Sequence, residues 1–108
     1  FFGLKSYGRY VGVERIPSNV TEFYCGEYEE LLSCYNTSTL DVFLPPEPVA
    51  GRKIEVRRVN ALVNVKKTDV SILAGTVDDT IDINYGDTWT FIYDGMYWLA
   101  NFKGRNDA

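Results

Sequence analysis

The sequence predicts an all-β fold, which we interpret as a small antiparallel β-sandwich or barrel-like module of short strands. Segments of about five residues with strand character recur about every eight to twelve residues, with turn residues between them. No segment with helical character extends beyond one or two turns, too short to sustain a helix. The strongest local signal is Asp94-Gly95 between two alternating strands, because Asp-Gly favours a tight hairpin turn.

The chain has 108 residues, the size of a single domain, and we place that β domain at residues 21–108. Residues 1–20 are rich in glycine and tyrosine and lack a helical period, so we interpret them as an N-terminal arm or connecting strand. The chain does not begin with Met, which indicates a fragment of a longer protein. It has no run of about 18 apolar residues, so membrane insertion is not expected.

In the first half of the domain, strand character is found at residues 20–25, 31–36 and 40–44. Pro45 ends the third of these strands, because proline cannot donate a hydrogen bond to a sheet. A hairpin over the first two strands would bring the only cysteines, Cys25 and Cys34, within reach of a disulfide. A reducing compartment would keep both as buried thiols, and we favour that interpretation.

In the second half, residues 52–67 are predicted to form a hairpin, and residues 71–75 and 80–84 two further short strands. Residues 88–102 are predicted to form the Asp-Gly hairpin. The expected pairs are Phe91 with Trp98, Tyr93 with Met96, and Trp89 with Ala100. A three-residue loop with a bulge is the alternative and would shift these pairs. Both tryptophans share the apolar face of the hairpin, which predicts core positions.

Charge is segregated along the chain. The net charge is −4, without the surplus of Lys and Arg that phosphate binding needs, so nucleic acid is not an expected partner. Residues 51–67 hold six of the eleven basic residues, whereas residues 68–95 hold six Asp and no Lys or Arg. These segments are either solvated strand faces or complementary edges that pair between subunits.

Chemistry-bearing residues are scarce. The sequence has no His, no phosphate-binding glycine motif and no paired-cysteine zinc spacing, so we expect no catalytic residues, no metal, no cofactor and no enzymatic activity. Asp78, Asp79 and Asp82 gather three carboxylates near one turn. Their spacing fits no calcium-loop motif, and Asp is a common turn residue.

Exposed aromatic and polar turns are the candidate ligand-binding positions. Tyr85 and Tyr97 each offer a flat ring with a hydroxyl, which suits stacking against a sugar. Asn84, Asp79 and Asp87 can hydrogen-bond sugar hydroxyls. The alternative is that both tyrosines pack in a subunit interface.

The order of strands and turns over roughly residues 30–102 resembles the small β modules near the distal ends of bacteriophage tail fibres, tailspikes and neck appendages. In those modules a strand ending in Leu-Pro precedes a Gly-initiated strand, and a Gly-containing turn leads to a final strand, an Asp-Gly hairpin and a Trp. The residues that match this pattern here are Leu44-Pro45, Gly51, Gly86, Asp94-Gly95 and Trp98.

The resemblance implies a homotrimer located in the virion, in the phage tail or an appendage, and made in the host cytoplasm. It implies host attachment through a cell-surface glycan or protein and brings no catalytic residues. Two other hypotheses stay open. The module is a purely structural trimerisation cap of a larger fibre protein, or it is a glycosidase module with carboxylates placed between subunits.

Overall fold

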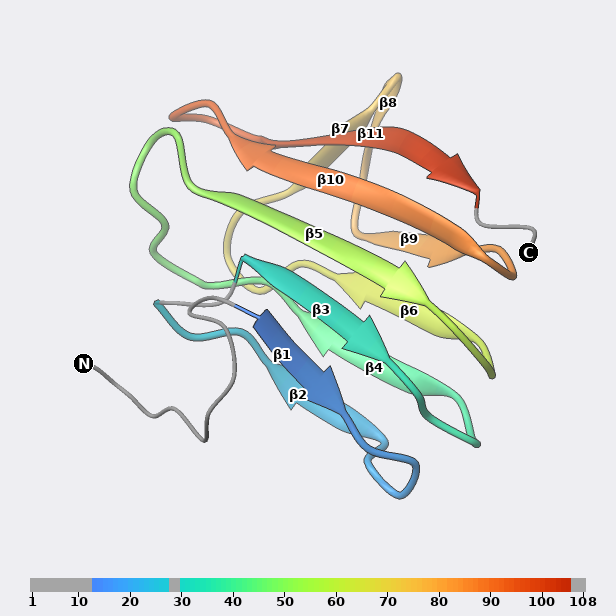
Figure 1. The fold of residues 1–108 in the computed structure, drawn as a ribbon. Coiled ribbons are helices and arrows are strands. Elements are labelled where there is room, and N and C mark those ends of the chain that lie inside the picture. The colour runs from blue at the N-terminus through green and yellow to red at the C-terminus, as the bar shows by residue number, and fades with distance from the viewer. Residues whose placement is uncertain (1–12, 28–29, 106–108) are drawn as a thin grey trace.

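A computed structural model describes residues 13–27 and 30–105 (Figure 1). These residues form strands and no helix, so the all-β prediction is confirmed. None of them forms a helix long and apolar enough to cross a membrane. The strands are β1 (Val13–Ile16), β2 (Glu22–Tyr24), β3 (Leu31–Cys34), β4 (Leu40–Phe43), β5 (Lys53–Arg58), β6 (Val63–Lys66), β7 (Ile72–Ala74), β8 (Thr76–Asp78), β9 (Thr80–Ile83), β10 (Asp87–Tyr93) and β11 (Trp98–Arg105).

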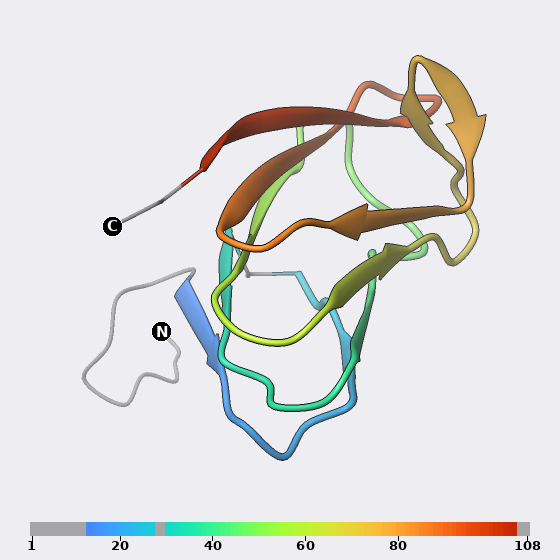
Figure 2. The same ribbon diagram turned by 90° about the vertical axis from the view of Figure 1, so that its right-hand side faces the viewer.

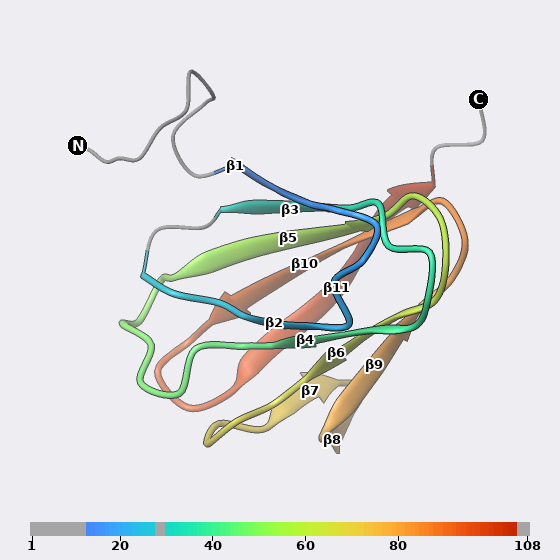
Figure 3. The same cartoon turned by 90° about the horizontal axis from the view of Figure 1, so that it is seen from below.

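The first six strands form a β-solenoid of about three coils. Each coil gives one strand to each of two facing sheets, which Figure 3 shows as two layers. β1, β3 and β5 are parallel neighbours in one sheet, and β2, β4 and β6 are parallel neighbours in the other. Val13 pairs with Leu31 and Leu31 with Glu55, so a coil takes roughly 20 residues, at the short end of solenoid periods.

Backbone hydrogen bonds continue around the turns between the two sheets. The amide of Tyr35 donates to the carbonyl of Ile16 at 3.0 Å, and the amide of Val59 donates to the carbonyl of Cys34 at 3.1 Å. The turns are therefore stacked in the same way as the strands. This continuity satisfies backbone groups that a loop would otherwise leave to solvent.

The predicted sandwich or barrel is wrong, and so is the hairpin predicted over residues 52–67. The hairpin over residues 20–36, on which a disulfide would depend, is absent as well, because β2 and β3 lie in different sheets. β5 and β6 lie in different sheets, because residues 59–62 turn the chain from one sheet to the other. The backbone groups of β5 are paired with β3 and β10 instead. Short strands separated by turns are common to sandwiches and solenoids, so strand spacing alone does not distinguish pairing with the next strand from pairing one coil away.

The parallel coils end at an antiparallel layer, seen above them in Figure 2. β9 is antiparallel to β6, and β10 is antiparallel to β5. β11 returns along β10, and the short strands β7 and β8 complete the edge, which gives a seven-stranded sheet facing a four-stranded one. The reversal of strand direction ends the parallel stacking at this side of the molecule.

The hairpin at Asp94-Gly95 is present, but its register differs from the prediction. Tyr93 pairs with Trp98, Phe91 with Ala100 and Trp89 with Phe102. The loop is longer than two residues, since the amide of Asp94 donates to the carbonyl of Tyr97 at 3.1 Å. The Asp94 carboxylate stabilises this loop by accepting hydrogen bonds from the amides of Met96 and Tyr97, each at 2.8 Å.

Gly95 has a φ of 102°, and a Cβ built there would meet no atom within 4 Å. We therefore expect Gly95→Val to destabilise the fold by about 1 kcal/mol or more, through backbone strain alone. Gly104→Val is the matched control, since a Cβ at that strand position also meets nothing within 4 Å and its φ is not in the left-handed region. Urea denaturation should show a loss for Gly95→Val only, and equal stability of the two variants would contradict this account.

The core lies between the two sheets and comes from alternate residues of the strands. Trp98 and Phe91 are its largest fully buried side chains, so the core position predicted for Trp98 is confirmed. Trp89 is only partly buried, against the edge of this core. Met96, predicted to pair with Tyr93, is 68% exposed because it lies in the loop.

Cys25 and Cys34 are both buried thiols, as we favoured. They follow β2 and end β3, which belong to different sheets rather than to one hairpin. Burial raises the pKa of the Cys34 thiol to about 12. A thiol with so high a pKa is protonated at neutral pH and unreactive as a nucleophile.

Candidate functional site

The predicted ligand-binding residues fall at two different ends of the strands. Asn84 and Tyr85 lie in the turn between β9 and β10, whereas Tyr97 lies in the loop between β10 and β11. β10 has seven residues and separates the two tyrosines by roughly 20 Å. Tyr85 and Tyr97 therefore cannot contribute to one small ligand site within a single chain.

Tyr85 is the better-presented of the two rings. Its side chain is 67% exposed, and the guanidinium of Arg58 lies over the ring, 5.7 Å from the centroid. Arg58 is itself fixed by hydrogen bonds to the carbonyls of Ile83, at 3.0 Å, and Asn60, at 2.9 Å. We name Arg58, Asn84 and Tyr85 the Tyr85 corner. It holds an exposed aromatic ring beside an exposed amide, an arrangement that suits contact with a sugar.

Asp87 is buried, whereas the predicted role of binding sugar hydroxyls needs an exposed carboxylate. The residue is 2% exposed, and its carboxylate accepts a hydrogen bond from Nε of Arg105 at 2.7 Å. This ion pair joins the start of β10 to the end of β11. The carboxylate of Asp87 therefore holds the two strands together rather than facing solvent beside Tyr85.

Asp79 is exposed and lies between β8 and β9, near the end of β6. Its carboxylate is 3.6 Å from the ammonium of Lys67, and its carbonyl accepts a hydrogen bond from the Lys67 amide at 2.9 Å. In the part of the chain that the structure describes, no group of three or more His, Cys, Asp or Glu residues is placed to hold a metal. Asp79 thus belongs to a turn that is stabilised by a backbone hydrogen bond and an ion pair, both with Lys67.

Tyr97 is partly buried next to the Asp94 loop. Hydrogen bonds from the amides of Tyr97 and Met96 lower the pKa of the Asp94 carboxyl below its ordinary value. The loop is therefore fixed by a carboxylate that stays ionised at neutral pH. The structure places Tyr97 in an ordered hairpin end, less accessible than Tyr85.

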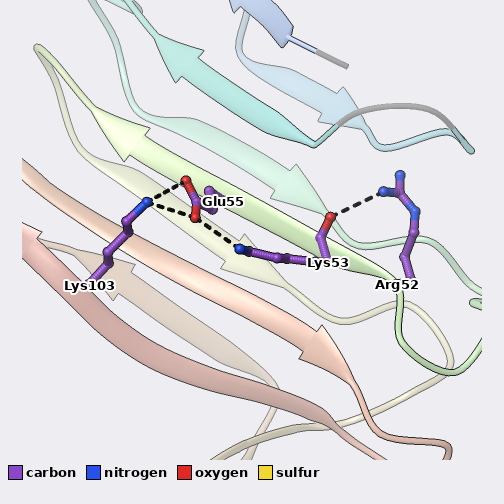
Figure 4. A network of polar contacts seen from close by, with 4 residues as sticks. All are labelled: Arg52, Lys53, Glu55 and Lys103. Carbon is purple, nitrogen blue, oxygen red and sulfur yellow. Dashed lines mark hydrogen bonds and ion pairs between the residues drawn. The ribbon is translucent and has the colours of Figure 1, made fainter. Parts of the chain in front are cut away.

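Two broad strand faces were missed by the sequence reasoning. Face A is the outer face of β1, β3, β5, β10 and β11, and face B is the outer face of β2, β4, β6 and β9. On face A, Lys103 contacts both oxygens of Glu55, at 3.0 and 2.9 Å, and Lys53 lies 3.6 Å from the same carboxylate (Figure 4). The hydrogen bond from Lys103 is the main cause that lowers the Glu55 pKa.

Face B combines stacked rings with carboxylates. Tyr24 and Phe43 are stacked with centroids 4.5 Å apart and planes 9° from parallel. In the neighbouring row, the Asp41 carboxylate accepts a hydrogen bond from Asn64 at 3.3 Å and lies 3.4 Å from the Lys66 ammonium. These rows could not have been found by aligning the sequence against itself at one period, because Glu22 pairs with Asp41, 19 residues on, whereas Asp41 pairs with Asn64, 23 residues on.

No known protein family, curated protein or solved structure matches this chain. The function of its surfaces is therefore inferred from the residues of this chain alone.

Proposed function

We propose that this chain is a distal module of a bacteriophage tail fibre or tailspike that trimerises and contributes to attachment to the host surface. The observation that supports binding is the Tyr85 corner, where a 67% exposed ring is held by Arg58 next to an exposed amide. Turns held on a rigid β scaffold are where binding residues usually collect. The ligand class that fits is a cell-surface glycan, whose apolar ring face stacks on Tyr85 and whose hydroxyls reach Asn84.

The pKa values of two carboxyl groups favour a module that binds a glycan without cleaving it. A glycosidase needs a carboxylic acid whose pKa is raised, so that it can donate a proton. The pKa values of Glu55 and Asp94 are instead lowered by their hydrogen bonds.

A purely structural cap is the second candidate, and the antiparallel layer favours it. Parallel coils can stack indefinitely, whereas β9 and β10 reverse the strand direction at one side of the residues that the structure describes. An element that ends a solenoid on one side is suited to the end of a longer fibre.

Binding on a glycan array of bacterial surface oligosaccharides separates these two candidates. We expect Tyr85→Ala to lower the signal at least tenfold, equivalent to about 1.4 kcal/mol, because the stacking surface is lost. Tyr85→Phe keeps the ring and should retain most of the signal. Tyr97→Ala, at the other end of β10, should leave it unchanged. A signal that Tyr85→Ala does not alter removes the Tyr85 corner as the site, and no signal from the trimer on any glycan favours the structural cap.

A further inference from the structure

Face A carries a surplus of positive charge. Side chains alternate across a strand, so residues next to buried core positions point outward. Ile54 and Val56 are buried, which places Lys53, Glu55 and Arg57 on face A. Arg15 joins them from β1 and Lys103 from β11, where it contacts Glu55. These outward positions thus carry four basic side chains and one carboxylate, which Lys53 and Lys103 contact, although the whole chain has a net charge of −4.

Face B carries the opposite charge. Val42, Val63 and Val65 point into the core, so the residues that alternate with them face outward. The outward row across β2, β4, β6 and β9 consists of Glu22, Asp41, Asn64 and Asp82, which are paired neighbours in the sheet. Lys66 offsets only one of these three carboxylates, and Glu22 and Asp82 are exposed.

Each face also has apolar surface beside its charges. On face B the Tyr24 ring, 63% exposed, lies on Phe43 and continues the acidic surface at the ends of β2 and β4. On face A the side chains of Ile92 and Leu99 are only partly covered, and the row continues to the partly covered Leu73 on the neighbouring strand β7. Charged rows next to apolar ones supply both steering and burial to an association.

We propose that the partner of each face is a second copy of this chain, with face A of one copy docked on face B of the next. The opposite charges of the two faces favour this contact and disfavour pairing a face with its own kind, because like charges brought together cost several kcal/mol. A contact between two different surfaces is heterologous: it closes into a ring of three where each copy is rotated by a third of a turn from the previous one, and otherwise it repeats as an open stack, whose mass above that of a trimer would overturn the proposed trimer. The inference rests on the trimer of the proposed function and names the surfaces that build it.

Charge reversal on each face tests this contact. The face A variant is Arg15→Glu with Arg57→Glu, which leaves the Glu55 network intact. The face B variant is Glu22→Lys with Asp82→Lys. By light scattering at low salt we expect the parent chain to be trimeric and each variant to associate at least tenfold more weakly. The chain that carries all four substitutions should regain the trimer, because its faces are again complementary.

Glu47→Lys with Asp69→Lys is the matched control, since both residues are exposed in loops and the change in net charge equals that of the face B variant. It should remain trimeric. A parent chain of monomer mass would overturn the proposed trimer and this contact together. Trimers from every variant would overturn the contact alone. A face B variant that keeps its trimer but loses its array signal would make face B a ligand surface and would also overturn the contact.

Discussion

Replacing Asn36 with Ala is expected to destabilise the fold by about 1–3 kcal/mol, the usual loss when a buried polar group is deprived of its partner. Asn36 is fully buried at the turn between β3 and β4. Its amide nitrogen donates to the carbonyls of Ser38 at 2.7 Å, Leu62 at 3.1 Å and Ala61 at 3.3 Å. These bonds tie the turn of the second coil to the turn of the third, so their loss weakens the stacking of coils.

Asn60→Ala is the matched control for this prediction. Asn60 is an exposed residue of the neighbouring turn, whose amide donates one long hydrogen bond of 3.4 Å to the carbonyl of Tyr35. Urea denaturation followed by circular dichroism should show little change for Asn60→Ala. Equal stability of the Asn36→Ala variant and the parent chain would mean that the side chain does not hold the coils together.

Asn36→Asp adds a readout that depends on pH. The substitution keeps the shape but places a carboxylate among three carbonyl oxygens. Burial and these oxygens would raise the pKa of the new carboxyl above its ordinary value. Its ionised form would therefore destabilise the fold at neutral pH, and part of the stability should return as the pH falls through that raised pKa. A loss of unfolding free energy that is the same at neutral pH and at a pH below the raised pKa would contradict this account of the turn.

The sequence is sufficient for the class of fold but not for the pairing of strands. Alternation at Leu40, Val42 and Leu44 predicts buried positions, and all three are fully or almost fully buried. Local alternation does not reveal which strand lies alongside, because parallel pairing one coil away leaves no signature in adjacent residues. Asn36 illustrates this: its partners Ala61 and Leu62 are in the next coil, so its sequence neighbours indicate only a turn.

The hairpin register fails for a related reason. Asp-Gly correctly predicts a turn with positive φ at Gly95, but the length of the loop is decided by the Asp94 carboxylate, which reaches the amides of Met96 and Tyr97. From Trp89 to Tyr93 the register moves by two residues, which keeps the paired side chains of the two strands on their predicted faces. Phe91 and Trp98 are therefore buried as expected, while Met96 is not. Among the candidate ligand residues, sequence could not foresee that Arg105 would hold Asp87 in a buried ion pair.

Trp98→Ala is expected to cost about 3–5 kcal/mol, the range found when a large buried aromatic side chain is deleted. Trp98 is the largest fully buried side chain, and it pairs with Tyr93 on one side and Ile72 on the other. Its ring lies 5.7 Å from that of Tyr93, so its loss would leave a cavity where β7, β10 and β11 meet. A small domain has a total stability of about 5–15 kcal/mol, so the variant would be close to unfolding at room temperature.

Trp98→Phe keeps most of the volume and should lose less, which keeps the test measurable if the Ala variant does not fold. Met96→Ala, two residues away in the exposed loop, should change stability by no more than about 0.5 kcal/mol. Urea denaturation followed by circular dichroism measures all three, and a Trp98→Ala chain as stable as the Met96→Ala chain would show that the antiparallel layer does not depend on this ring.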